Sequence, residues 1–389
     1  MTLSDDVAAR RWRVLASAMV SFFAVGITFF AIPPLIPTLR VTFALSNLSI
    51  GLLMGAIAVP AIALSIPIGA ALDRWPPRAA GLAGLTAMLV GAAVFAAAPG
   101  FAWLVAGRLL FGAGGLLMNL LLARLISVAF AGRELALAMG LFTGVYNASM
   151  IALFSFHPWL EAHLGWRGEL STLAVLVLVA IPLHALAVPR GRPAGQGRPR
   201  QEAVRVLPPP LVALGVSWML YWVGFSALLT FAPEWAGGGP SGLLVTSVIT
   251  WIAMIGTPLA GAAIDRVGRP HLWGAVSVGL MAATLGSMAT GAVPTIVAMA
   301  VLGTVAAAVP PAFYSLPARL VPAERVGFAF GLITALSNLG AVIGPALAGA
   351  VRDATPAWAP VWGTLAGVAL AGAVGAAFAR PKATPPVRS

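Results

Sequence analysis

The stretch Gly69-Ala70-Ala71-Leu72-Asp73-Arg74 decides the fold of this chain, because it returns almost unchanged as Gly261-Ala262-Ala263-Ile264-Asp265-Arg266. The second copy begins 192 residues after the first, close to half of the 389-residue length. Each copy places an acidic and a basic residue in a short turn between two long apolar segments. A charged turn that recurs at half-chain spacing indicates an internal duplication.

The composition is that of a polytopic membrane protein. Hydrophobic residues make up 60% of the chain and charged residues 9%, with a mean hydropathy of +0.97, whereas soluble domains carry about 25% charged residues. Cysteine is absent, which excludes disulfides, thiol catalysis and cysteine metal sites. The sequence contains no nucleophile–base arrangement, metal cluster or phosphate-binding loop. We therefore expect no catalytic residue, no metal and no cofactor.

The apolar segments predict twelve transmembrane helices. A bilayer core is crossed by roughly 20 helical residues, and continuous apolar runs favour helices over the alternating strands of a barrel. The predicted helices are residues 14–36, 48–72, 79–98, 101–123, 134–156, 170–188, 209–232, 242–264, 272–291, 295–317, 326–350 and 356–379. The chain is thus expected to be an all-α membrane protein.

The basic residues are distributed unevenly among the predicted loops. With the N-terminus inside, 19 of the 23 basic residues fall in cytoplasmic segments, and the external loops hold Arg40, Arg167 and Arg352. This asymmetry obeys the positive-inside rule. It predicts a multi-pass protein of the cytoplasmic (inner) membrane with both termini in the cytoplasm. It also accounts for most of the net charge of +12 without nucleic acid as a partner.

Residues 189–208 divide the chain. They are rich in glycine, proline and arginine and have no apolar period, which predicts a flexible cytoplasmic linker. The linker would join an N-terminal six-helix bundle, residues 1–188, to a C-terminal one, residues 209–389. Binding of its arginines to anionic lipid is the alternative to a plain solvated linker.

These motifs resemble the major facilitator superfamily of secondary transporters. One family signature is Gly-x-x-x-Asp-(Arg/Lys)-x-Gly-(Arg/Lys)-(Arg/Lys), in the loop between helices 2 and 3. The first copy here has Gly69, Asp73, Arg74 and Arg78, with Pro76 and Pro77 replacing the glycine and a basic residue; the second has Gly261, Asp265, Arg266, Gly268 and Arg269. Another signature, Arg-x-x-x-Gly-x-Gly in helix 4, is met by Arg108, Gly112 and Gly114. The resemblance implies two pseudo-symmetric six-helix bundles around a central cavity, in a monomer.

The resemblance also implies a gating role for Asp73, Arg74, Asp265 and Arg266. Asp73 would lie near the start of helix 326–350, and Asp265 near the start of helix 134–156. A carboxylate is favoured there by the positive end of the helix dipole, and the contact would hold the halves together while the cavity faces outward. The alternative is topological, since charges at a helix end also keep that end inside.

Arg108 is, apart from His184, the only ionisable residue well within a predicted span. An intramembrane charge costs about 3 kcal/mol or more and marks a functional candidate. Arg108 would attract an anionic substrate or take part in proton coupling. Two alternatives stay open. Its guanidinium could bond helix-end carbonyls in a structural role, or it could reach the external interface about 10 Å away.

Asn147 and Asn338 occupy equivalent positions of the duplication. Gly140-Leu141-x-Thr143-x-x-x-Asn147 matches Gly331-Leu332-x-Thr334-x-x-x-Asn338. Two amides at equal depth suit a ligand at the bundle interface; the alternative is an interhelical hydrogen bond. Tyr146 lies about 100° around the helix from Asn147 and need not share its face.

Aromatic residues supply further candidates. Trp218, Tyr221, Trp222 and Phe225 follow i, i+3, i+4, i+7 spacing, which places them on one helical face. We expect Trp218 and Tyr221 to contact a ring-bearing or apolar substrate, although packing and lipid contact explain most membrane aromatics. Asn119 and Tyr314 align with each other in the two halves and are added as weaker substrate-binding candidates.

The histidines and carboxylates bear on coupling. The four histidines show no close pairing and no carboxylate neighbour, so we expect no metal site and interfacial positions for His157 and His184. No carboxylate falls near a midplane, which argues against a carboxylate-based proton antiporter. The helix-5 antiporter signature Gly-x-x-x-Gly-Pro is missing after Gly140 and Gly144, although Gly340, Gly344 and Pro345 complete it in the second half.

The sequence therefore predicts a secondary transporter that moves a small organic solute by alternating access. Uptake or exchange of an organic anion or weak acid fits best, because the single buried charge is positive. A proton or a counter-solute is the candidate for coupling. The alternative is an exporter of hydrophobic drugs or metabolites. A receptor or membrane-embedded enzyme on the same scaffold finds no support in the motifs.

Overall fold

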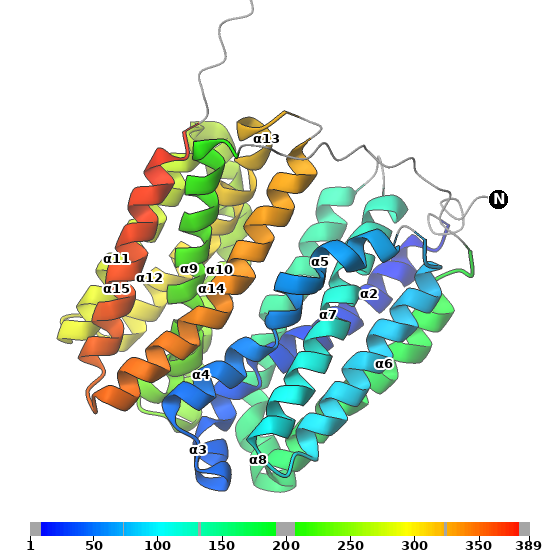
Figure 1. Cartoon of the computed structure of the whole chain (residues 1–389), viewed down its shortest axis with the longest axis horizontal. Coiled ribbons are helices and arrows are strands. Elements are labelled where there is room, and N and C mark those ends of the chain that lie inside the picture. The colour runs from blue at the N-terminus through cyan, green and yellow to red at the C-terminus, as the bar shows by residue number, and fades with distance from the viewer. Residues whose placement is uncertain (1–8, 73, 131–133, 192–206, 323–324, 381–389) are drawn as a thin grey trace, which may run out of the picture.

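The structure is a computed structural model that describes residues 9–72, 74–130, 134–191, 207–322 and 325–380. Every regular element in this part of the chain is a helix (Figure 1). Asp73 and most of the predicted linker lie outside the described residues. The helices of the first half are α2 (Arg11–Phe30), α3 (Ile32–Phe43), α4 (Asn47–Ala56), α5 (Val59–Leu72), α6 (Pro77–Ala96), α7 (Phe101–Ala129) and α8 (Leu135–Ala187). Those of the second half are α9 (Pro209–Trp235), α10 (Gly239–Val267), α11 (Pro270–Thr290), α12 (Thr295–Tyr314), α13 (Pro317–Leu320), α14 (Val326–Ala354) and α15 (Ala359–Phe378).

Eleven helical segments of the described chain are long and apolar enough to cross a membrane, and one of them accounts for two crossings. α8 has 53 residues, about 80 Å at helical rise, which is far too long for one span. Gly165 divides it into two arms. Its φ is 64°, a backbone conformation that glycine adopts at little cost. The prediction of twelve crossings is confirmed.

Helix boundaries differ from the prediction where proline or glycine interrupts a helix. The first predicted span is split into α2 and α3 at Ala31, just before Pro33 and Pro34, because proline removes backbone donors. The second is split into α4 and α5 before Pro60. The prediction of a loop over residues 157–169 was wrong, since helix continues up to and after Gly165.

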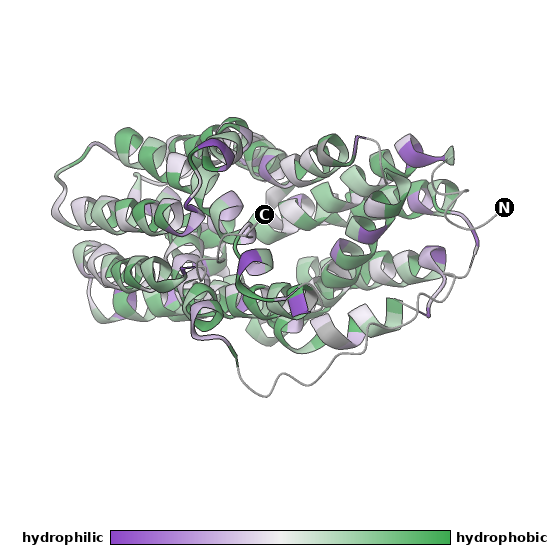
Figure 2. Ribbon diagram, turned by 90° about the horizontal axis from the view of Figure 1, so that it is seen from above, coloured by the Kyte–Doolittle hydropathy of each residue, from purple (hydrophilic) through white to green (hydrophobic). Residues whose placement is uncertain are grey.

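The helices form the two predicted bundles, with α2–α8 in the first and α9–α15 in the second (Figure 1). Within the first bundle α6 packs on α7 and α2 on α8; within the second, α11 packs on α15 and α9 on α14. α4 and α5 contact α14 across the interface, and α8 contacts α10. The helices are predominantly hydrophobic along their lengths (Figure 2), and the outer surface exposes residues such as Leu186 and Phe378, as contact with lipid requires.

The bundles meet most closely at the end of the molecule opposite the chain termini, here called the closed end. α4 and α14 touch there through their backbones. A Cβ added at Gly51 would lie 2.1 Å from the Pro345 carbonyl oxygen, and one at Gly349 would lie 2.2 Å from that of Asn47. Small residues permit such close approach of helices in membranes. The ribbons diverge toward the other end, here called the terminal end (Figure 1).

Candidate functional site

A cavity of ≈ 610 Å³ lies between the two bundles. This volume is within the range of small-molecule sites. Its walls come from α2 and α8 of the first bundle and from α9, α10 and α12 of the second. The aromatic members of the lining are Phe29, Phe30, Tyr146, Trp218, Tyr221, Trp222, Phe225 and Tyr314. Neither bundle forms the cavity alone, so movement between the bundles would change its shape.

The cavity is reached from the terminal end. Tyr314, at the last turn of α12, lines it and is 44% exposed. Phe30 and Leu229 line it toward the closed end and are each 2% exposed. The burial of the deep residues and the exposure of Tyr314 leave the terminal end as the route of access.

The lining is aromatic and uncharged. None of the residues that border this cavity carries a charged side chain. Thr143, Thr250 and Thr257 also line it, but their hydroxyls donate to carbonyls of their own helices. Trp218 stacks on Tyr221 with ring centroids 5.3 Å apart and on Phe313 at 5.1 Å. This stacked layer gives the cavity a flat apolar wall of fixed orientation.

Two indole donors in this wall have no partner among the described residues. The Nε1 atoms of Trp218 and Trp222 are buried and form no hydrogen bond there. A buried donor without an acceptor costs about 1–3 kcal/mol. A ligand whose oxygen atoms reached these groups after a rearrangement of the wall would recover part of that free energy. The wall is therefore better suited to a solute that carries hydrogen-bond acceptors than to a hydrocarbon.

The predicted substrate residues separate into two groups. Asn147, Trp218, Tyr221 and Tyr314 line the cavity, and so does Tyr146, the neighbour of Asn147 in the chain. Asn338 donates from Nδ2 to the Thr334 carbonyl at 2.8 Å and is not among the lining residues. Asn119 is exposed on α7 and is likewise outside the lining. Substrate contact by any of these residues stays a prediction.

Arg108 lies behind the cavity wall instead of in it. Its side chain is fully buried, and its Nε is 3.2 Å from the Leu53 carbonyl oxygen. One terminal nitrogen donates to the Thr28 carbonyl and the other to Met54, at 3.1 Å. These carbonyls lie in the last turns of α2 and α4, where intrahelical partners run out and partial negative charge collects. The contacts match the structural alternative considered for Arg108.

Three of the predicted gating residues, Arg74, Asp265 and Arg266, lie at the terminal end, where the bundles are apart. Asp73 is outside the described residues. Arg74 is exposed after α5, and Asp265 and Arg266 are exposed in the last turn of α10. Within the described residues, Asp265 and Arg266 form no ion pair. Their gating role stays a prediction that concerns a conformation other than this one.

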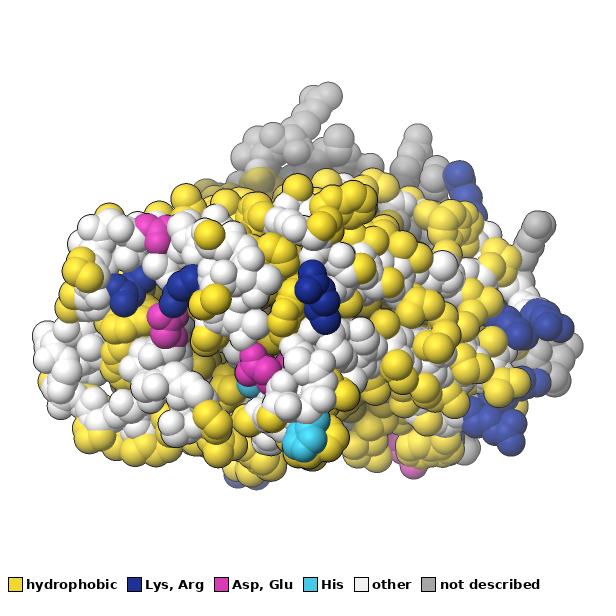
Figure 3. All heavy atoms as spheres, turned by 90° about the horizontal axis from the view of Figure 1, so that it is seen from below, with side chains coloured by type: hydrophobic (Ala, Val, Ile, Leu, Met, Phe, Trp, Pro, Cys, Tyr) yellow, Lys and Arg dark blue, Asp and Glu magenta, His cyan; other side chains and the backbone are white. Residues whose placement is uncertain are grey.

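The closed end holds polar contacts that the sequence analysis missed. Arg40 of α3 pairs with both carboxylate oxygens of Glu234 on α9, at 3.1 Å each. Asp353 of α14 accepts from the backbone N–H groups of Asn47 and Leu48, at 2.8 Å each. Acidic and basic side chains lie close together on this face (Figure 3). These contacts tie the second bundle to the first helices of the chain.

The expectation that the histidines have no carboxylate neighbour was wrong for His157. Its Nδ1 is 2.9 Å from Glu169, and its Nε2 is 3.3 Å from Glu161. Both His157 and His184 are buried within the protein, and their depth relative to the membrane interfaces stays a prediction. The i, i+4 spacing of His157 and Glu161 was the available signal, but it has meaning only if residues 157–164 are helical. No group of three potential metal ligands was found among the described residues.

Comparison with known proteins identifies relatives over most of the chain. The family model described as Major Facilitator Superfamily matches residues 18–239 and 238–389. Human monocarboxylate transporter 11 is 28% identical over 335 residues, covering 76% of this chain and 69% of its own. The fosmidomycin resistance protein of Escherichia coli (strain K12) is 24% identical over 330 residues, 79% of each chain.

Solved structures show the same fold. A crystal structure of the nucleoside transporter NupG superimposes with a TM-score of 0.78 at 14% identity, covering 94% of this chain and 98% of that one. A bacterial homologue of the human lysosomal transporter Spinster, in an inward-facing and unoccupied conformation, gives a TM-score of 0.74 at 17% identity, covering 95% and 96%.

Proposed function

This chain belongs to the major facilitator superfamily, and we propose that it is a secondary active transporter of small weak organic acids, working by uptake or exchange. The single observation that carries this proposal is the central cavity, which combines an aromatic wall with unpartnered donors. An aromatic or aliphatic body would pack on Trp218 and Tyr221. The carboxyl oxygens would accept hydrogen bonds from the indole groups of Trp218 and Trp222 and from the amide of Asn147.

Arg108 adds to the preference for an anion without touching it. Its contacts given above are to neutral carbonyl oxygens, so its charge is not cancelled by a carboxylate there. A buried charge acts over a longer distance than one in water, because the surrounding dielectric is low. The relative described as monocarboxylate transporter 11 supports the same class of substrate.

Orientation and conformation follow from charge and burial. We infer that the terminal end faces the cytoplasm, because most basic residues lie there, and that the protein resides in the cytoplasmic membrane. The conformation described here would then be open to the cytoplasm. Closure of the terminal end would bring Asp73, Arg74, Asp265 and Arg266 toward the opposite bundle, and a proton or a counter-solute would drive the cycle in a monomer.

The asparagine pair provides a matched test. Purified protein in liposomes is assayed for uptake of radiolabelled benzoate and pyruvate, first unmodified and then as Asn147→Ala and Asn338→Ala. Asn147 lines the cavity and Asn338 does not. We expect Asn147→Ala to raise KM about tenfold, equivalent to 1.4 kcal/mol, and Asn338→Ala to leave KM within about twofold. Equal effects of the two variants would remove Asn147 from the binding site, and absence of uptake by the unmodified protein would refute the substrate class.

A second candidate is an exporter of hydrophobic compounds. The uncharged aromatic lining and the relative described as fosmidomycin resistance protein favour it. Everted membrane vesicles that accumulate a neutral aromatic dye under a pH gradient, but take up no benzoate, would select this candidate over the first. Trp218→Ala should weaken dye accumulation in that case, since Trp218 forms the centre of the stacked wall.

A further inference from the structure

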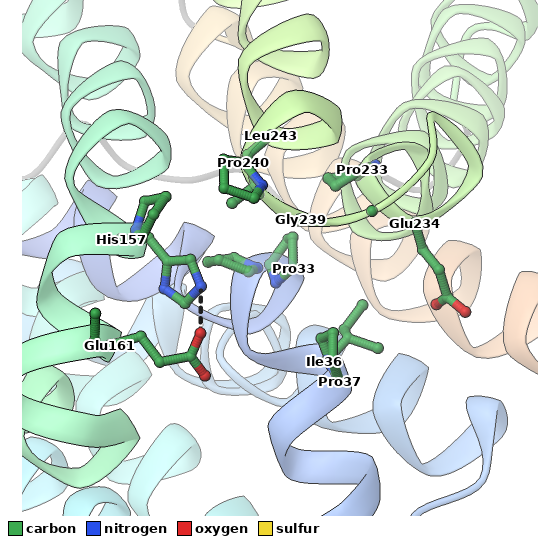
Figure 4. A pocket seen from close by; sticks show the side chains of 14 residues that line it. Pro33, Ile36, Pro37, His157, Glu161, Pro233, Glu234, Gly239, Pro240 and Leu243 are labelled. Carbon is green, nitrogen blue, oxygen red and sulfur yellow. Dashed lines mark ion pairs between the residues drawn. The ribbon is translucent and has the colours of Figure 1, made fainter.

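A second polar site lies at the closed end, away from the central cavity. His157 and Glu161 are one turn apart on the first arm of α8, and Glu169 follows Gly165 on the second arm. The change of chain direction at Gly165 places the two carboxylates at different edges of one imidazole ring (His157 and Glu161 in Figure 4). His157 is 4% exposed and Glu169 is 2% exposed, so the pair is shielded from solvent.

The geometry of this cluster calls for an additional proton. Nδ1 of His157 is 2.9 Å from both oxygens of Glu169, and Nε2 is 3.3 Å from Glu161. A neutral imidazole has a single N–H and donates to one acceptor only. Its other nitrogen would then direct a lone pair at a carboxylate oxygen. One more proton, on the ring or on a carboxyl group, makes both contacts attractive.

The charges around the cluster reinforce this requirement. From α3, Thr38 donates to Glu161, and Arg40 pairs with Glu234 of α9. The neighbouring part of α10 contributes glycine, proline and leucine to the adjoining cavity of ≈ 350 Å³ and no titratable group. With a neutral imidazole, the carboxylates of Glu161, Glu169 and Glu234 outnumber the guanidinium of Arg40 and that of Arg167, which lies on the second arm of α8 and donates to the Ala98 carbonyl. Carboxylates gathered this closely repel one another.

The cluster is connected to the contact between the bundles through α3. Thr38 links α3 to Glu161, and Arg40, two residues later, links α3 to Glu234 in the second bundle. The adjoining cavity is itself lined from both bundles, by α3 and α8 on one side and by α9 and α10 on the other. Glu161 retains 36% side-chain exposure, which gives protons a route from the closed-end surface.

We propose that His157, Glu161 and Glu169 form a proton-binding site, filled from the compartment at the closed end, whose occupancy favours closure of that end. The ring or a carboxyl group gains the proton on closing and returns it to the same compartment on opening. The site therefore sets the pH dependence of the transport cycle. The link to transport rests on the proposed function, whereas the link between protonation and closure does not.

The test uses the absence of native cysteine. Thr42→Cys on α3 and Ser241→Cys on α10 place spin labels on exposed residues of the two bundles at the closed end. The distance distribution is measured in lipid nanodiscs from pH 5 to pH 8. We expect the population with widely separated labels to grow as pH rises. A tenfold difference in proton affinity between closed and open forms changes their ratio by up to about tenfold.

Three variants in the labelled protein decide the origin of that change. His157→Gln removes the imidazole that both carboxylates contact, and Glu169→Gln supplies an amide that can donate to the ring without an additional proton, so both should abolish the pH response. His163→Gln is the matched control, because His163 is exposed on the same arm and contacts the Trp159 carbonyl; it should respond as the unmodified protein does. If His157→Gln fails to fold, Glu169→Gln gives the decision.

The outcomes separate this inference from the proposed function. A distance distribution that does not change with pH, or a response retained in a folded His157→Gln or Glu169→Gln protein, overturns the proton site. Uptake of benzoate by the same preparation is measured in parallel. Failure of uptake alone removes the proposed substrate and leaves the pH result standing, whereas normal uptake with no pH response removes only the proton site.

Discussion

Arg108 concentrates several helix-end contacts in one buried side chain. Its guanidinium bonds carbonyls of α2 and α4 from a position on α7. Arg108→Met leaves these carbonyls unsatisfied, at about 1–3 kcal/mol for each group, so we expect a clear drop in melting temperature. The measurement is thermal unfolding in detergent, with the exposed Arg13→Met as the control expected to unfold like the unmodified protein.

Arg108→Lys distinguishes the structural role from an electrostatic one. Lysine keeps the charge but cannot reproduce the planar fork that bonds two helices at once. If Arg108 acts mainly on helix ends, Arg108→Lys will unfold at nearly the temperature of Arg108→Met. Full benzoate uptake by Arg108→Lys, together with none by a folded Arg108→Met, would show instead that the charge is what transport requires.

The sequence predicted some of the cavity-lining residues but missed the buried His157 contact, and the reason is physical. Asn147 and Trp218 were predicted because helical spacing and the internal repeat carry over directly into the folded chain. Asn338 occupies the equivalent position but bonds the backbone of its own helix, a rotamer choice that repetition does not determine. His157 was missed because its partner Glu169 approaches only through the backbone conformation of Gly165.

Among elements, the contact between α4 and α14 depends on the absence of side chains. A methyl group at Gly51 would overlap the backbone of α14, and such overpacking costs about 1–3 kcal/mol. We expect Gly51→Ala to separate the closed end and to raise the widely separated population of Thr42 and Ser241 labels roughly tenfold. Gly363→Ala on α15 is the control, because nothing lies within 4 Å of an added Cβ there. An unchanged distance distribution in Gly51→Ala would show that α14 yields without opening the interface.

The number of membrane-crossing helices could be predicted from the sequence, but the residues at which the helices begin and end could not. Apolar length alone identified all twelve crossings, since the bilayer imposes the same requirement on each. The splits at Ala31 and before Pro60 follow from prolines, which apolar length does not take into account, and the helical conformation over 157–164 depends on tertiary packing. Buried contacts such as that between His157 and Glu169 compensate for the polar residues that made 157–169 resemble a loop.

For the whole molecule, orientation in the membrane has a direct test. Trp75→Cys lies at the terminal end and Thr42→Cys at the closed end, and both positions are exposed. In intact cells we expect a membrane-impermeant maleimide to label Thr42→Cys at least about tenfold faster than Trp75→Cys, since positively charged segments remain in the cytoplasm. Permeabilised cells provide the control, in which both should react. The reverse order in intact cells would invert the proposed topology.

The contact of Asp353 at the closed end resembles the contacts expected at the terminal end. Its carboxylate accepts the first N–H groups of α4 across the interface, which is the kind of contact that the resemblance implies for Asp73 and Asp265 at the opposite pole. If both ends of the interface are held by the same kind of contact, neither end is intrinsically the more stable. The preferred conformation then depends on the small free-energy difference between the two sets of contacts. Weakening one set would shift the populations of the two conformations without unfolding either bundle.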